Sequence, residues 1–122
     1  MALVAYAVPI QPGKTEQWKR MVGEINGPRR KEFEDAHQRE HVRQRVFLQS
    51  AAQGDMVVVT LEGDDPIGSF RRLISSRDPF TRWFTQQVNE IHGIDVIQMI
   101  NQPLPQLWVD SEPGAARQRK AA

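Results

Sequence analysis

The sequence predicts an α+β domain with the element order βαββαβ, folded as a four-stranded antiparallel sheet with helices on one face. Three observations support this prediction. Short β-branched runs alternate with segments of helical periodicity. A Gly-Asp pair joins two strand-like runs at hairpin spacing, and two Asp-Pro pairs mark consecutive helix starts. The 122 residues fit one domain, which we place at residues 1–110, followed by a disordered basic tail at residues 111–122.

The first half of the chain predicts a strand, a helix in two pieces and an edge strand. Residues 3–10 (LVAYAVPI) are apolar and stop at a Pro-Gly pair, as a strand does. Residues 14–27 carry four apolar side chains on one helical stripe, namely Trp18, Met21, Val22 and Ile25. A second helical piece covers residues 29–40. Residues 42–49 alternate with a period of two, so that Val42, Gln44, Val46 and Leu48 share one face.

The second half predicts a buried strand, two helices and a final strand. Residues 56–62 (MVVVTLE) are apolar on both faces, and Gly54-Asp55 before them suits a hairpin turn. Helices are predicted to begin at Asp65-Pro66 and Asp78-Pro79, with aspartate as the N-cap, and the second helix ends at His92-Gly93. Residues 94–100 suggest a short extended piece, and residues 106–110 (QLWVD) a final strand.

The predicted sheet leaves one apolar face without a cover. The first and third strands are expected to be central because both are apolar on both faces, whereas Arg43 and Arg45 mark the second as an edge strand. Because the helices cover one face only, we expect an isologous homodimer in which two sheets pack face to face.

Composition excludes several classes of protein. The chain has no cysteine, so it has no disulfide, thiolate nucleophile or cysteine metal site. The formal net charge is +1, and without the basic tail the domain carries 13 basic and 14 acidic residues, which argues against nucleic acid as a partner. No run approaches the ~20 apolar residues of a membrane span, and no signal peptide is evident. We therefore expect a soluble, cytoplasmic protein.

Residues 37–41 (HQREH) match the H-x-x-E-H zinc pattern of some metalloproteases. Two histidines four residues apart share a helical face only if the helix continues through His41. Strand alternation begins at Val42, so we expect His41 at or just past the helix end, where histidine tolerates a left-handed backbone. We predict no metal and no cofactor.

Five residues are candidates for binding a ligand. Trp83, beside Phe84, is suited to line a pocket for a flat apolar compound, with Tyr6 and Trp108 as polar groups from the strands. His37 and His92 are the ionisable candidates within helices. The alternatives stay open, because aromatic stripes also form cores and histidines also occupy helix ends. No catalytic residue is assigned.

The segments PIQPGKTEQWKRM, RVFLQ, GDMVVVTLEGDDP, DPFTRWFTQQVNEIHGID and QLWVD resemble an uncharacterised family of small bacterial proteins. That family is part of the dimeric α/β-barrel (ferredoxin-like) superfamily, which is related in fold to antibiotic-biosynthesis monooxygenases, stress-responsive barrel proteins, muconolactone isomerases and haem-degrading enzymes. The specific part of the resemblance is EGDDP followed by DPF-x-RWF and HG-x-D. It implies the fold, the homodimer and a ligand cleft between sheet and helices, and it carries over no catalytic residue.

Two functions remain open from the sequence. The first is a cofactor-free small-molecule enzyme of the monooxygenase, isomerase or cyclase type, acting on an aromatic or apolar compound in the cleft. The alternative is a non-catalytic dimeric module that binds a ligand or serves a structural role. Only the superfamily resemblance separates the two.

Overall fold

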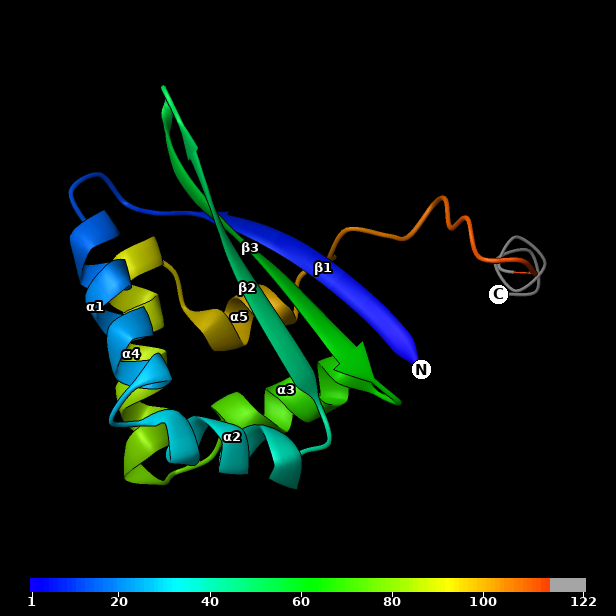
Figure 1. The fold of residues 1–122 in the computed structure, drawn as a ribbon, viewed down its shortest axis with the longest axis horizontal. Coiled ribbons are helices and arrows are strands. Elements are labelled where there is room, and N and C mark those ends of the chain that lie inside the picture. The colour runs from blue at the N-terminus through cyan, green and yellow to red at the C-terminus, as the bar shows by residue number, and fades with distance from the viewer. Residues whose placement is uncertain (115–122) are drawn as a thin grey trace.

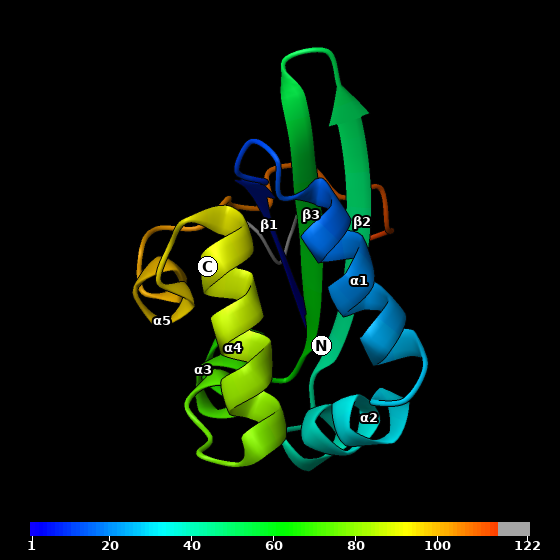
Figure 2. The same ribbon diagram turned by 90° about the vertical axis from the view of Figure 1, so that its left-hand side faces the viewer.

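A three-stranded antiparallel sheet with the strand order β1-β3-β2 carries the helices on one side (Figures 1 and 2). The structure, a computed structural model, describes residues 1–114. The elements are β1 (Ala2–Pro9), α1 (Thr15–Asn26), α2 (Arg30–Arg39), β2 (Arg43–Ala51), β3 (Gly54–Gly63), α3 (Pro66–Ile74), α4 (Pro79–His92) and α5 (Val96–Ile100).

The period-2 alternation of the strands separates a buried inner face from an outer face. On β3, Val57, Val59 and Leu61 point inward and are almost fully buried. The register places Tyr6 of β1 opposite Val59, and Gln44 of β2 opposite Leu61, so both side chains share that inner face. The β2–β3 hairpin projects beyond the rest of the molecule, as Figures 1 and 2 show.

The predicted four-stranded, ferredoxin-like sheet is wrong. Within residues 1–114 the sheet has three strands, and residues 106–110 form none of them. Pro103 and Pro105 lack the N–H that a ladder needs, and because they are two residues apart both gaps fall on the same side of the backbone. This segment instead runs past the start of β1 and away from the body of the protein (Figure 1).

The missing fourth strand also changes the position of β1. The prediction that β1 and β3 are both central holds for β3 only, since β1 lies at an edge of the described sheet. The face-to-face dimer was inferred from a four-stranded sheet and loses that basis. The prediction that β2 is an edge strand is confirmed.

Local signals placed the helix ends well. Asp65 and Asp78 accept hydrogen bonds from the backbone N–H groups of Gly68 (3.2 Å) and Thr81 (2.9 Å), so both act as N-caps. Gly93 ends α4 with φ 64°, the left-handed conformation expected there. Residues 96–100 form the short helix α5, not the expected extended piece. Asp95, which had no assigned role, caps α5 by accepting from the N–H of Ile97 at 3.0 Å.

The junction between α2 and β2 is a tight turn. The helix ends at Arg39, and His41 has φ 56°, as the sequence predicted. The end of β3 lies so close to this turn that a Cβ on Gly63 would be 2.7 Å from the carbonyl oxygen of His41. Only glycine allows this approach of the two backbones.

None of the helices in the described range is long and apolar enough to cross a membrane. The predicted basic tail begins in a turn at residues 112–114, and its residues 115–122 lie outside the described part of the chain.

Candidate ligand-binding site

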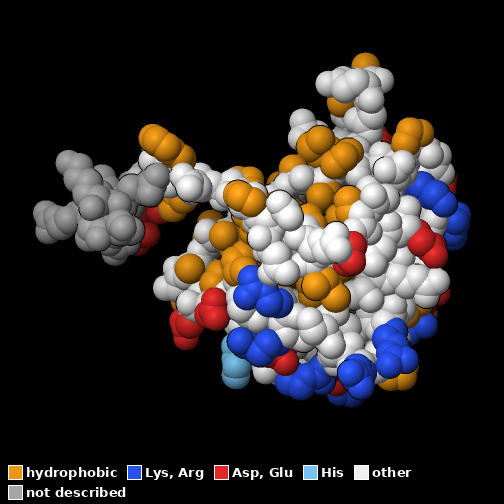
Figure 3. Space-filling view, turned by 180° about the vertical axis from the view of Figure 1, so that it is seen from behind, with side chains coloured by type: hydrophobic (Ala, Val, Ile, Leu, Met, Phe, Trp, Pro, Cys, Tyr) orange, Lys and Arg blue, Asp and Glu red, His pale blue; other side chains and the backbone are white. Residues whose placement is uncertain are grey.

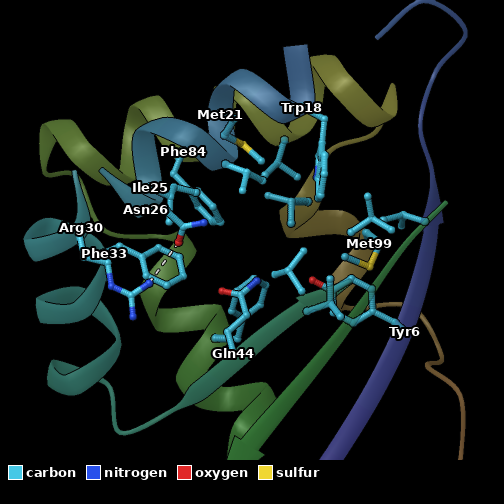
Figure 4. A pocket seen from close by; sticks show the side chains of 18 residues that line it. Tyr6, Trp18, Met21, Ile25, Asn26, Arg30, Phe33, Gln44, Phe84 and Met99 are labelled. Carbon is cyan, nitrogen blue, oxygen red and sulfur yellow. Dashed lines mark hydrogen bonds between the residues drawn. The ribbon is translucent and has the colours of Figure 1, made fainter. Parts of the chain in front are cut away.

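A cavity of about 240 Å³ lies between the inner face of the sheet and the helices (Figure 4). Its wall comes from all three strands and from α1, α2, α3, α4 and α5, and most of it is apolar. Trp18, Met21 and Ile25 line it from α1, Phe84 and Val88 from α4, and Val57 and Val59 from β3. A cleft between sheet and helices, which the resemblance implied, is therefore present.

The cavity opens beside β2. Val46 lines it and is nevertheless 43% exposed, and Asn26 and Arg30, also in the wall, are exposed. The guanidinium of Arg30 donates to the side chain of Asn26 at 3.3 Å and to Glu34 at 2.8 Å. The contact with Asn26 ties the end of α1 to the start of α2 at the mouth of the cavity.

Two polar groups lie deeper in the wall. Figure 4 shows the hydroxyl of Tyr6 and the amide of Gln44 pointing into the cavity from β1 and β2. Burial raises the pKa of Tyr6 well above its ordinary value, so the phenol stays protonated at neutral pH. Tyr6 therefore offers a hydrogen-bond donor that does not ionise.

His37 lies directly behind Gln44, between α2 and β2. Its Nδ1 is 2.7 Å from the carbonyl oxygen of Phe33, and its Nε2 is 2.7 Å from Oε1 of Gln44. The ring also packs on Phe33 with a centroid distance of 4.2 Å. Burial lowers the pKa of His37 more than its two hydrogen bonds raise it, so the neutral imidazole is favoured at neutral pH.

The other three predicted residues lie away from the cavity wall. Trp83 is half-buried on α4, with the guanidinium of Arg29 4.3 Å from its ring. His92 is buried and its Nδ1 lies 2.8 Å from the carbonyl oxygen of Pro9, which ties α4 to β1. Trp108 is 75% exposed in the segment after α5. Of the five predicted ligand-binding residues, the structure places Tyr6 in the wall and His37 one layer behind it.

The side chains of the H-x-x-E-H pattern point to separate partners. His37 contacts Phe33 and Gln44, whereas Glu40 accepts from Arg72 at 3.0 Å. Among residues 1–114 no three His, Asp or Glu side chains are grouped as metal ligands.

Sequence reasoning missed Gln44, although the signal was present. The alternation of β2 already placed Gln44 on the apolar face with Val42, Val46 and Leu48, and a polar side chain on a buried face needs a partner. The helical stripe containing Trp18 and Met21 was recognised as core, and only its distance from the sheet in the folded protein makes it a cavity wall.

No protein-family model and no curated protein sequence matches this chain.

Proposed function

We propose that the protein binds a small ring compound with one polar substituent in the cavity between sheet and helices. The observation that carries the proposal is the cavity itself: an apolar wall with the hydroxyl of Tyr6 and the amide of Gln44 pointing inward. Binding sites for small molecules commonly combine an apolar lining with a few polar groups that orient the ligand.

The volume limits the size of the ligand. An apolar protein cavity of roughly 150 Å³ holds one benzene molecule. A cavity of about 240 Å³ therefore has room for a substituted single ring or a small fused pair of rings. Drug-sized ligands occupy sites of roughly 300–1,000 Å³, so we expect compounds below that size.

The wall favours binding over catalysis. Of the described residues that line the cavity, only Tyr6 and Arg30 are ionisable. Arginine stays protonated, and burial keeps Tyr6 protonated as well, so neither group can accept a proton as a general base at neutral pH. The enzymatic alternative, a cofactor-free monooxygenase, isomerase or cyclase, rests only on the resemblance to an uncharacterised family, and the four-stranded sheet which that resemblance implied is absent from residues 1–114.

A titration with p-cresol, followed by nuclear magnetic resonance of the labelled protein, tests the proposal. We expect saturable shifts at residues of the cavity wall. Val59→Phe, which fills the cavity, should abolish them, whereas Val58→Phe on the outer face of the same strand should not. If the wild-type protein shows no shift at millimolar p-cresol, toluene or indole, the proposal fails.

We also propose that the protein forms a homodimer through the free edge of β1. Figure 3, seen from behind, shows hydrophobic side chains gathered over the side where β1 and α5 lie. The groove there is lined by Leu3, Val4, Ile67, Ile100, Leu104 and Leu107. Among residues 1–114 no strand pairs with the outer edge of β1, and an unprotected edge of this kind accepts another strand.

The occupant we propose for this edge is the segment 106–110 of a second copy, in place of the chain's own Gln106 and Leu107, which line the groove in this structure. It forms neither helix nor strand, and its Val109 is 85% exposed. Reciprocal exchange gives a closed two-fold dimer. Sedimentation at micromolar concentration should give twice the chain mass of 14.0 kDa. A chain ending at Pro105 should sediment as a monomer, and one ending at Asp110 as a dimer; a monomeric full-length chain would contradict the proposal.

A further inference from the structure

We infer that His37 determines which ligands the cavity selects, because it fixes the direction of the Gln44 amide. With neutral His37 the carbonyl oxygen of Gln44 faces the cavity, so the site prefers a ring compound with a hydroxyl or N–H donor, such as a phenol. This inference rests on the proposed function, since it names the ligand class of the same cavity.

The first step is the tautomer of His37. Its Nδ1 lies 2.7 Å from the backbone carbonyl oxygen of Phe33. A carbonyl oxygen only accepts hydrogen bonds, so Nδ1 must carry a proton. In the neutral ring Nε2 is then unprotonated and acts as an acceptor.

The second step is the orientation of Gln44. Nε2 of His37 lies 2.7 Å from the Gln44 amide, with Oε1 toward the ring, an arrangement that matches a protonated imidazole. A half-turn of the amide exchanges oxygen and nitrogen without moving the chain, and it then donates an N–H to the neutral ring. The amide has two ends, so whichever group does not face His37 faces the cavity.

The surroundings of His37 are of mixed charge. The ring packs on Phe33. The open hollow on its other side is lined by the ionisable groups Arg30, Glu34 and His41 from α2 and its turn, Arg43 from β2, Glu62 from β3, Asp64, and Met1 with its amino group. Burial is the largest influence on the pKa of the ring and favours the neutral form, and the nearby positive charge of Arg30 acts in the same direction.

The third step is the geometry of the ligand. Tyr6 and Gln44 come from β1 and β2, which flank β3, and they lie opposite Val59 and Leu61, two residues apart along β3, so their backbones are roughly 12 Å apart. Both polar ends point into the cavity (Figure 4). A phenolic hydroxyl between them, above Val59, can accept from Tyr6 and donate to Oε1 of Gln44. An ether in the same place can only accept, so it leaves Oε1 unsatisfied.

Calorimetric titration with p-cresol and 4-methylanisole tests this inference, because the two probes share a ring and differ in the donor. At pH 8 we expect p-cresol to bind about tenfold more tightly, the effect of one buried hydrogen bond. As the pH is lowered from 8 through the titration of His37, its protonation should reduce this preference, while p-cresol itself, with a pKa near 10, stays neutral throughout.

Three variants provide the controls. Gln44→Leu should bring the two probes to similar affinity, Gln44→Glu should keep the preference for p-cresol, and His37→Phe should remove its dependence on pH. Equal binding of both probes to the wild-type protein would overturn this inference and leave the proposed function intact. If neither probe binds, both proposals fail.

Discussion

Replacing Val57 and Val59 with isoleucine should stabilise the protein, because both side chains line the cavity. Each change adds one methylene, and a buried methylene contributes about 0.8 kcal/mol. A cavity of about 240 Å³ would cost roughly 6 kcal/mol if it were empty and unrelaxed, at ~24 cal/mol per Å³. The cavity volume of about 240 Å³ is larger than the volume of the two added methylenes, so both fit inside it.

Because the cavity is open to solvent beside Val46, water can enter it, and hydrated space costs less than empty space, which lowers the expected gain. We expect the double variant to gain about 1 kcal/mol in free energy of unfolding, a rise of roughly 4 °C in Tm. Urea denaturation followed by tryptophan fluorescence measures it. Val58→Ile is the control on the outer face of β3, away from the cavity wall, and its gain is doubled for the comparison because it adds one methylene where the double variant adds two.

The same double variant should also bind p-cresol more weakly. A loss of more than about 1 kcal/mol in stability would refute the reasoning, because it would mean that the added methylenes are overpacked. A gain equal to twice that of Val58→Ile would refute it as well, since the cavity would then play no part.

Three further predictions concern helix ends and buried histidines. Asp78→Ala should lower the free energy of unfolding by about 1 kcal/mol through loss of the N-cap, and Asp78→Asn by much less, both measured by urea denaturation. Gly93→Ala should destabilise by about 1 kcal/mol or more, because φ is 64° and the new Cβ would meet Gln11, whereas Gly23→Ala, in open space on α1, should stabilise. Burial lowers the pKa values of His37 and His92, so the unfolded chain takes up protons on these residues at a higher pH than the folded chain does. The free energy of unfolding, measured by urea denaturation at several pH values, should therefore keep its full value above about pH 6.5 and decrease as the pH falls below it. This decrease should be smaller in His92→Gln.

The helix ends and the pairing of β2 with β3 could be predicted from the sequence because their causes are local, although the hairpin turn lies at Ala52-Gln53 and not at the predicted Gly54-Asp55, which already belong to β3. An aspartate N-cap and a left-handed glycine each act within three or four residues, so Asp65, Asp78 and Gly93 could be assigned without knowing the fold. The fourth strand could not be assigned in this way. The residues QLWVD have strand propensity, but after Pro103 and Pro105 the chain only passes the start of β1 and forms no ladder with its free edge.

The site was only partly predictable for a related reason. Tyr6 could be chosen as a polar group on a strand, but the first strand is apolar on both faces, so its sequence does not show which face Tyr6 occupies. Trp83 was chosen for its chemistry, but the packing of α4 turns Phe84 and Val88 toward the cavity and leaves Trp83 against Arg29. The partnership of His37 with Gln44 crosses from a helix to a strand, and no periodicity within either element indicates it.

The close approach of Gly63 to the carbonyl of His41 makes two distant positions depend on each other. A side chain at position 63 would push the end of β3 away from the turn, and a chain that carries one has to leave α2 by a different route. In relatives of this protein, residue 63 and the length or conformation of the turn at residues 40–42 should therefore change together. A survey of natural variation would then detect this contact as a correlated pair.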